Sequence, residues 1–336
     1  MIIDVHAHWG PWFFTMDVAG ANLSAMDRFG IDLSIVSATE AVIYDAPAGN
    51  RALAAWLEGQ DRHLGYVTVN PRRQADAERD LRAYLPTGRF VGVKIHTDYT
   101  RSPVSSPQTR EALAMVAQAG VPALVHTWGA TVLDLAQACL DTPGLRVIAG
   151  HMGADGHAHA IEAAGACDRL YLEPCYSHAP AGRIAQVAAA VDRTRLLFGT
   201  DSTLIDPASA FGAVAAAGLD AETAELVAWR NAVRLSIWTL RPSPLYRAAT
   251  LTRSDQRMIP RRRFLQAAAA SAAAVTIPAT PAMAAAREPK GTITDLGPAS
   301  VASPWATPSS SATCSTSARA AWRRTSSAPG TWARTG

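Results

Sequence analysis

The segment IIDVHAH, residues 2–8, decides the fold that we expect for this chain. It joins a short apolar run to two histidines, His6 and His8, that stand two positions apart. Side chains alternate across a strand, so residues two apart project from the same face. The segment therefore predicts a first strand whose end presents both imidazoles on one side. They could bind a metal ion, or they could be ordinary polar residues at a strand end.

Seven further runs of strand length follow, and most gaps between them hold a helix-length, often Ala-rich segment. We expect strands over 2–8, 33–39, 64–70, 90–97, 122–127, 146–151, 170–177 and 195–202, and helices over 75–85, 108–119, 131–140, 161–167 and 181–191. Alternation of strand and helix requires parallel strands with right-handed crossovers, and eight such units close into a (β/α)8 TIM barrel. An open doubly wound sheet is the alternative, but no Gly-x-Gly-x-x-Gly turn follows the first strand.

The positions of the polar residues favour the barrel. In a barrel the C-terminal ends of all strands converge on one rim, where active sites are built. Polar residues fall at these expected ends, namely His6, His8, Lys94, His96, His126, His151, Glu173, Cys175 and Asp201. We therefore expect a single mouth that gathers most of the histidines with a lysine and carboxylates.

Six motifs, in this order along the chain, resemble the amidohydrolase superfamily, specifically the amidohydrolase-related branch that includes aminocarboxymuconate-semialdehyde decarboxylase. They are IDVHAH, VGVKIH, LVHT, AGHMG, LLFGTDS and WRNAVRL. The resemblance implies that one divalent metal ion, zinc, is bound by His6, His8, His126 and Asp201. It also implies that His151 stands beside the metal-bound water, so that His151 and Asp201 are the catalytic residues. Three imidazoles and one carboxylate leave zinc a position for water.

Several of these residues have alternative roles. Asp201 could be only a helix cap, because Asp-Ser-Thr precedes the next helical segment. His151 could be another metal ligand or a hydrogen-bond donor to the substrate. Lys94 could be carboxylated and bridge two metal ions, as in related binuclear barrels. We favour one metal ion, with Lys94 as the anchor of an anionic group.

We expect the substrate to contact Trp9, Lys94, His96 and Trp128. Trp9 begins an aromatic run with Trp12, Phe13 and Phe14 in the first βα loop, and such loops form the barrel mouth. Candidates for a carboxylate clamp are Arg51, Arg101 and Arg183, among which the sequence does not choose.

A second His-x-His pair, His157 and His159, repeats the spacing of the metal pair. It leads into an expected helix, where residues two apart point about 200° apart, so it should not chelate a metal. We assign this pair, together with His63 and His178, to surface or loop positions.

Charge is distributed unevenly along the 336 residues, whose formal net charge is +3. Residues 1–241 carry 19 Lys+Arg and 25 Asp+Glu, a net of −6, and residues 242–336 carry 12 and 3, a net of +9. The basic excess lies in a Ser/Thr/Ala/Arg-rich tail rather than on a patterned element, so nucleic-acid binding is not indicated. The 4 cysteines form no Cys-x-x-Cys pair, which fits a reducing cytoplasm.

The domain organisation follows from these patterns. We expect the metal-dependent barrel over 1–241, closed by a helix near 222–240, and a linker over 242–257. Residues 258–286 resemble a twin-arginine export signal. Such signals act at the N-terminus of a protein and not in the middle of a chain, so we interpret the segment as a fusion or reading-frame artefact. Residues 287–336 have the composition of a disordered, low-complexity tail. No secretory signal precedes Met1, so we expect a cytoplasmic protein without a membrane anchor.

The function that we expect is metal-dependent hydrolysis, in which a metal-activated water attacks the carbonyl of an amide, lactone or ester. The first alternative is a metal-dependent, non-oxidative decarboxylase of an aromatic or muconate-like acid. The second is a binding barrel without activity. The expected partner is a small-molecule substrate, a carboxylate or an aromatic acid, and a homodimer would suit this class.

The tail gives a first prediction. Truncation after about residue 245 should leave metal content, melting temperature and turnover unchanged, because every expected strand and candidate ligand precedes that point. Metal analysis, thermal unfolding and activity assays of the two chains measure this. A truncated chain that loses metal or melts several degrees lower would show that the Ala-rich segment packs on the barrel.

Overall fold

The computed structural model describes residues 1–12, 18–176, 178 and 180–240 of the chain. Some of our expectations concern residues outside these ranges and remain predictions. They concern Phe13 and Phe14, the linker over 242–257, the signal-like segment over 258–286 and the tail over 287–336.

Within the described part, seven strands form one parallel sheet in sequence order, from β1 to β7. The strands are β1 (Ile3–Trp9), β2 (Leu33–Ala38), β3 (His63–Thr68), β4 (Phe90–Ile95), β5 (Ala123–His126), β6 (Val147–Gly150) and β7 (Leu170–Leu172). Each strand pairs in parallel with its successor, as the alternation predicted. The prediction of a TIM barrel is confirmed.

The eighth position of the barrel is filled by an irregular segment, residues 196–202, where we expected a regular strand. It contacts β7 through the Leu197 N–H, which donates to the Leu172 carbonyl at 2.9 Å. It contacts β1 through the Val5 N–H, which donates to the Phe198 carbonyl at 3.0 Å. The segment does not continue as a strand because Asp201 adopts a left-handed backbone conformation, with φ 58°.

Strand β7 is also shorter than expected, ending at Leu172 rather than near 177. Pro174 follows two residues later and has no N–H to donate to a ladder. Glu173 and Cys175 therefore lie just beyond the strand end and not within it.

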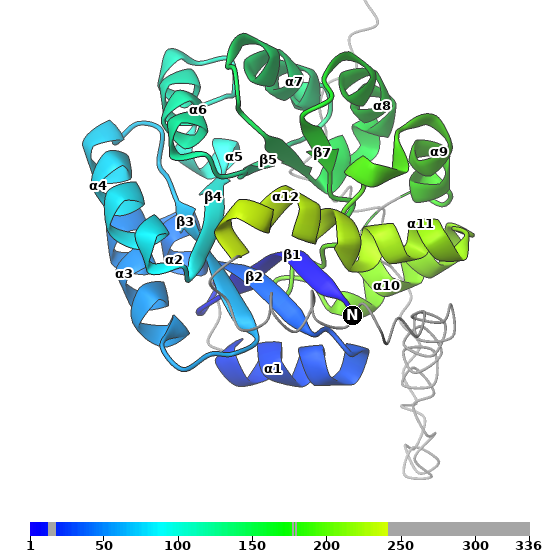
Figure 1. The fold of residues 1–336 in the computed structure, drawn as a ribbon, viewed down its shortest axis with the longest axis horizontal. Coiled ribbons are helices and arrows are strands. Elements are labelled where there is room, and N and C mark those ends of the chain that lie inside the picture. Colours follow the sequence, from blue (N-terminus) through cyan, green and yellow to red (C-terminus); the bar gives the residue numbers. More distant parts are fainter. Residues whose placement is uncertain (13–17, 177, 179, 241–336) are drawn as a thin grey trace, which may run out of the picture. The chain divides into compact units, whose positions relative to one another are not determined.

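Helices surround the sheet as a ring (Figure 1). They are α1 (Val18–Phe29), α2 (Thr39–Ile43), α3 (Ala46–Leu57), α4 (Gln74–Tyr84), α5 (Thr97–Thr100), α6 (Pro107–Ala119), α7 (Thr131–Asp141), α8 (His157–Ala166), α9 (Arg183–Ala190), α10 (Pro207–Ala216), α11 (Ala221–Glu225) and α12 (Asn231–Leu240). A π-helical turn, Leu226–Arg230, joins α11 to α12. Short 3₁₀ segments cover Leu85–Thr87 and Arg193–Arg195, and His151–Gly156 is a kinked turn with positive φ at His151, Met152, Gly153 and Ala154.

Helix α12 closes one end of the barrel, across which it lies in Figure 1. Its Ala232 and Leu235 belong to a buried cluster that also takes residues from β1 to β6 and from the eighth segment. Because all of these elements meet in it, the cluster is the barrel interior. The end that remains for a site is the opposite one, where the strands end.

The first strand has an irregularity that positions its histidines. Its pairing with β2 shifts register between Asp4 and Ala7, so Ile3 and Val5 belong to the barrel interior while His6 and His8 line the mouth. The buried Asp4 carboxylate lies at this bulge and accepts from the Thr200 hydroxyl at 2.5 Å. Burial raises the pKa of Asp4 to about 7, although the hydrogen bonds to Thr200 and His6 oppose this.

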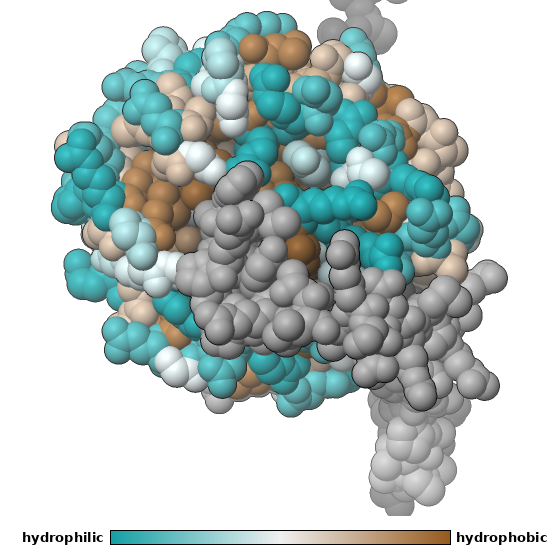
Figure 2. Space-filling model, viewed as in Figure 1, coloured by the Kyte–Doolittle hydropathy of each residue, from teal (hydrophilic) through white to brown (hydrophobic). Residues whose placement is uncertain are grey.

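On the face that Figure 2 shows, the ring of helices carries many hydrophilic side chains, with hydrophobic areas between them. None of the helices among the described residues combines the length and apolarity that crossing a bilayer would require.

Candidate active site

A cavity of about 610 Å³ opens at the C-terminal ends of the strands. Its walls combine histidines and aromatic rings with one lysine and two aspartates. The lining residues are His6, His8, Trp12, Lys94, His96, Asp98, Tyr99, His126, Trp128, His151, Tyr176, His178, Asp201, Leu204 and Ile205. The single mouth expected from the strand ends is therefore present.

Three buried donors at the bottom of this cavity could hold a metal ion. His8 Nε2 lies 2.9 Å and His6 Nε2 lies 3.5 Å from Asp201 Oδ1. Ligands placed about 2.1 Å from one ion are separated by distances of this size, so the group fits a divalent metal. Of the four ligands that the resemblance implied, the structure brings these three into one compact cluster.

The protonation states of the two histidines suit this role. Burial, assisted by the nearby Lys94, lowers the pKa of His6 to about 4, and burial also lowers that of His8. Neutral imidazoles keep a lone pair for a metal ion. Burial opposes the charge of Asp201, but the adjacent His6 and His8 hold its pKa well below the usual range.

Asp201 is not a helix cap. Helix α10 begins at Pro207, and its cap is Asp206, whose carboxylate accepts from the Ala208 N–H at 2.8 Å. The capping alternative for Asp201 is therefore wrong, and its side chain lines the cavity instead.

Lys94 lies deeper than a rim anchor would. Its side chain is buried, and its Nζ is 2.6 Å from His6 Nε2. Burial lowers the pKa of Lys94, although nearby carboxylates oppose this. The amine therefore stands directly beside the metal-type donors.

His126, the fourth implied ligand, lines the cavity but lies outside the compact cluster. Its Nε2 lies 3.2 Å from Asp98 Oδ2, and its ring stacks on His96 with centroids 3.9 Å apart. Its buried Nδ1 has no hydrogen-bond partner among the described residues. One nitrogen of His126 is thus still free to take a ligand.

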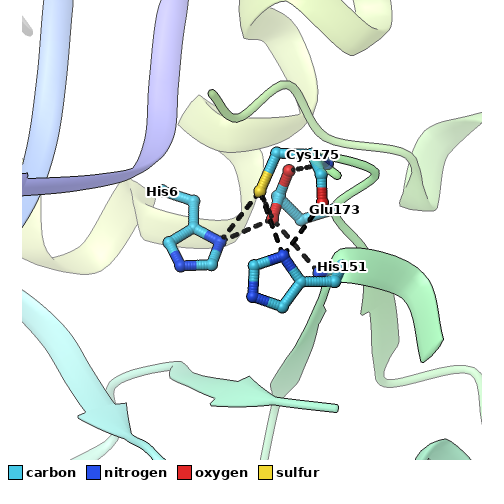
Figure 3. Close-up of side chains that lie close together, drawn as sticks. All are labelled: His6, His151, Glu173 and Cys175. Carbon is cyan, nitrogen blue, oxygen red and sulfur yellow. Dashed lines mark hydrogen bonds and ion pairs between the residues drawn. The ribbon is translucent and has the colours of Figure 1, made fainter. Parts of the chain in front are cut away.

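His151 faces the cavity on a strained turn. It adopts φ 65°, a left-handed conformation that costs a non-glycine residue energy. Its Nδ1 donates to the Cys175 carbonyl at 2.9 Å. This bond fixes one tautomer, in which Nε2 carries the lone pair and points away from Cys175 (Figure 3).

Arg183 supports this turn and does not clamp a substrate. Its buried guanidinium donates to the carbonyls of His151 at 3.0 Å and Ala154 at 2.9 Å, and also to that of Pro174. The other clamp candidates, Arg51 and Arg101, are exposed and do not line the cavity. None of the three arginines therefore faces the site.

The aromatic wall differs from the expected one at its first residue. Trp9 stacks on Trp56, with centroids 5.1 Å apart, and does not line the cavity. Trp12 takes that place and makes an edge contact with His8, with ring centroids 4.8 Å apart. Trp128 lines the cavity as expected and makes an edge contact with Tyr176 at 5.1 Å.

Sequence reasoning missed or misplaced some residues. Tyr99 and Tyr176 line the cavity, and their positions just after strand ends were the signal that could have found them. His178 also lines the cavity, although we assigned it to a loop role. His63 is buried, with its Nε2 3.0 Å from Asn22, so its surface assignment is wrong.

Behind His6 lies a second buried cluster of four side chains, shown in Figure 3. His6 Nδ1 donates to Glu173 Oε2 at 2.6 Å, and Cys175 Sγ donates to the same oxygen at 3.1 Å. Burial alone would raise the pKa of Glu173, but His6, His151 and the Cys175 N–H lower it to about 2. The carboxylate is therefore charged and acts only as an acceptor.

Comparison with known proteins identifies a family. The chain matches the family model described as amidohydrolase over residues 3–235. No curated protein matches it significantly.

Solved structures with the same fold include two decarboxylases and a hydrolase. 5-Carboxyvanillate decarboxylase from Sphingomonas paucimobilis is 14% identical, with a TM-score of 0.57 over 70% of this chain and 98% of that one. A manganese-bound dihydroxybenzoic acid decarboxylase from Polaromonas, in complex with 2-nitroresorcinol, is 16% identical, with a TM-score of 0.56 over 70% and 96%. A probable 2-pyrone-4,6-dicarboxylic acid hydrolase from Acinetobacter baumannii is 15% identical, with a TM-score of 0.53 over 70% and 98%. At these identities the likeness shows the fold.

The donor cluster generates a prediction about metal content. The purified chain should bind about one divalent ion tightly, as expected for a single His/Asp site. His8→Ala should weaken binding by more than the roughly 10–100-fold that loss of an outer-shell partner costs. Elemental analysis and chelator competition measure both.

A matched control is available in the second His-x-His pair. His159→Ala removes an exposed imidazole from α8, outside the cavity, and should leave metal binding unchanged. Equal losses in the two variants, or two tightly bound ions whose retention depends on Lys94, would contradict the single-site assignment.

Proposed function

Since the chain belongs to the amidohydrolase family, we propose that it is a metal-dependent, non-oxidative decarboxylase of an aromatic acid. The observation that carries the proposal is the composition of the cavity. Its bottom combines the metal-type donors with the buried Lys94 amine, and its walls include Trp12, Trp128 and Tyr176. A flat ring that bears a carboxylate matches both parts.

The similar structures support the same reading. Two of the three described above are decarboxylases of aromatic acids by their names, and one is a probable hydrolase. We therefore prefer the decarboxylase alternative to the hydrolase that the sequence led us to expect.

In the proposed site His6, His8 and Asp201 hold the metal ion, and His126, which lines the same cavity, is the candidate fourth ligand. Zinc suits these donors, and manganese is the other candidate because a decarboxylase of similar fold contains it. When bound, a divalent ion supplies positive charge that polarises and orients substrate oxygens.

The side chains of this chain would perform the remaining steps. Lys94 Nζ lies where it can donate to the substrate carboxylate before that group leaves. His151, with Nδ1 held by the Cys175 carbonyl, exchanges protons through Nε2. For this, Nε2 would first take up a proton from solvent and then pass it to the ring carbon that bears the carboxylate, and this transfer precedes cleavage of the C–C bond. Carbon dioxide then leaves, and the bonding electron pair restores the aromatic system.

The reaction class can be tested directly. The metal-loaded chain, incubated with hydroxylated benzoates and muconate-like acids, should release trapped carbon dioxide with the matching decarboxylated product. Ring-opening of lactones such as 2-pyrone-4,6-dicarboxylate, without gas release, would favour hydrolysis instead. Inactivity on both panels with metal bound would favour a binding barrel.

The role of His151 can be separated from metal binding. His151→Asn should keep the metal while kcat falls by roughly 10²–10⁴-fold, the usual contribution of a general acid–base group. His157→Asn, in a partly buried position on α8 that does not line the cavity, is the control and should leave kcat unchanged. Loss of the metal in His151→Asn would reassign His151 as a ligand.

A further inference from the structure

We propose that Glu173 is a positioning residue that fixes the tautomer of His6 and so keeps His6 Nε2 available to a metal ion. The proposal rests on the proposed function, because it assumes that the cluster of His6, His8 and Asp201 binds metal. Glu173 lies outside the cavity and is fully buried, at 0% exposure. Its role would therefore be to act through His6 and not on the substrate.

The hydrogen bonds around Glu173 leave only one arrangement of protons. Oε2 accepts from His6 Nδ1 at 2.6 Å and from Cys175 Sγ at 3.1 Å, and Oε1 accepts from the Cys175 N–H at 2.5 Å. The His151 N–H also points at Oε2, at 3.4 Å. A carboxylate surrounded by donors cannot donate in return, so His6 must carry its proton on Nδ1.

The opposite nitrogen of His6 then has a lone pair. His6 Nε2 faces Lys94 Nζ at 2.6 Å and Asp201 Oδ1 at 3.5 Å, which is the side of the metal-type donors. Figure 3 shows Nδ1 directed at Glu173 and Cys175 and the other ring nitrogen directed away from them. Carboxylates in this outer position raise the basicity of a ligating imidazole and hold its ring in place.

The backbone around Glu173 fixes where the carboxylate can be. A Cβ added at Gly199 would lie 2.5 Å from Glu173 Oε1, so the eighth segment passes the carboxylate without room for a side chain. On the other side, Arg183 donates to the carbonyl of Pro174, the next residue along the chain. The carboxylate is thus held between two elements and can orient His6 without moving itself.

The four side chains could instead form a second metal site, because His6, His151, Glu173 and Cys175 each have a ligand atom within 4.8 Å of the others. Two observations favour hydrogen bonding. The distance of 2.6 Å from His6 Nδ1 to Glu173 is that of a charge-assisted hydrogen bond. His151 Nδ1 is already used as a donor to the Cys175 carbonyl.

The decisive variant is Glu173→Gln in the full chain. The glutamine carbonyl can keep the Oε1 contact with the Cys175 N–H, which places its amide NH₂ at the position of Oε2. The His6 Nδ1–H, the Cys175 thiol and the His151 N–H would then all face an NH₂ group, which cannot accept from them. His6 can remove its own donor–donor contact only by moving its proton to Nε2. Glu162→Gln, whose side chain is 70% exposed on α8, removes the same charge and is the matched control.

Two measurements read the result. In metal-free protein labelled with ¹⁵N-histidine, His6 should be the Nδ1–H tautomer in the wild type and in Glu162→Gln, and should shift towards Nε2–H in Glu173→Gln. Zinc affinity, measured by chelator competition, should fall roughly 10–100-fold in Glu173→Gln alone. Glu173→Asp keeps an acceptor at a shorter reach and should retain the Nδ1–H tautomer, which preserves the test if Glu173→Gln does not fold.

Other results would overturn the proposal. An unchanged His6 tautomer in Glu173→Gln shows that Glu173 does not set it, whatever happens to stability. A second zinc equivalent that Cys175→Ser removes shows that the cluster is itself a metal site. A tautomer that follows Glu173 in a chain that binds no zinc would defeat the proposed function and the link to metal binding, so the two failures can be told apart.

Discussion

The site depends on the contact between β1 and the eighth segment of the barrel. The carbonyl of His6 accepts from the N–H groups of both Thr200 and Asp201, at 3.3 and 2.7 Å. This shared acceptor places a carboxylate from the end of the fold beside two imidazoles from its beginning. The Asp4 carboxylate strengthens the same junction by accepting from the Thr200 N–H and hydroxyl. The contact that closes the barrel therefore also brings the metal-type donors together.

Alternation of strands and helices was enough to predict the barrel and the rim on which its polar residues meet. It could not predict how each strand ends, because local backbone conformation decides this. The bulge in β1 and the left-handed conformation of Asp201 have no periodic signal in the sequence. His6 and His8, the residues of β1 that were assigned to the metal, both line the cavity, although the irregularity between Asp4 and Ala7 includes His6.

Residue type alone also could not predict which of several similar residues would reach the cavity. Trp9 and Trp12 belong to one aromatic run, yet Trp9 packs on Trp56 and only Trp12 reaches the cavity. Arg183 looked like a ligand for an anion, but the strained turn at His151 leaves carbonyl groups that need a donor, and Arg183 supplies it. Such partners become visible only when segments far apart in the sequence are brought together.

The charges of the site indicate the order in which its ligands must bind. Asp201 and Glu173 are buried and ionised, the pKa of His6 near 4 leaves it neutral, and Lys94 contributes at most one positive charge. Two charged carboxylates against at most one ammonium leave the site with a net negative charge, and buried charge without compensation is costly, so this set favours binding of a cation. A substrate carboxylate would add a further negative charge beside Asp201. In the function proposed above, such a carboxylate would bind better once a cation had reversed the local charge.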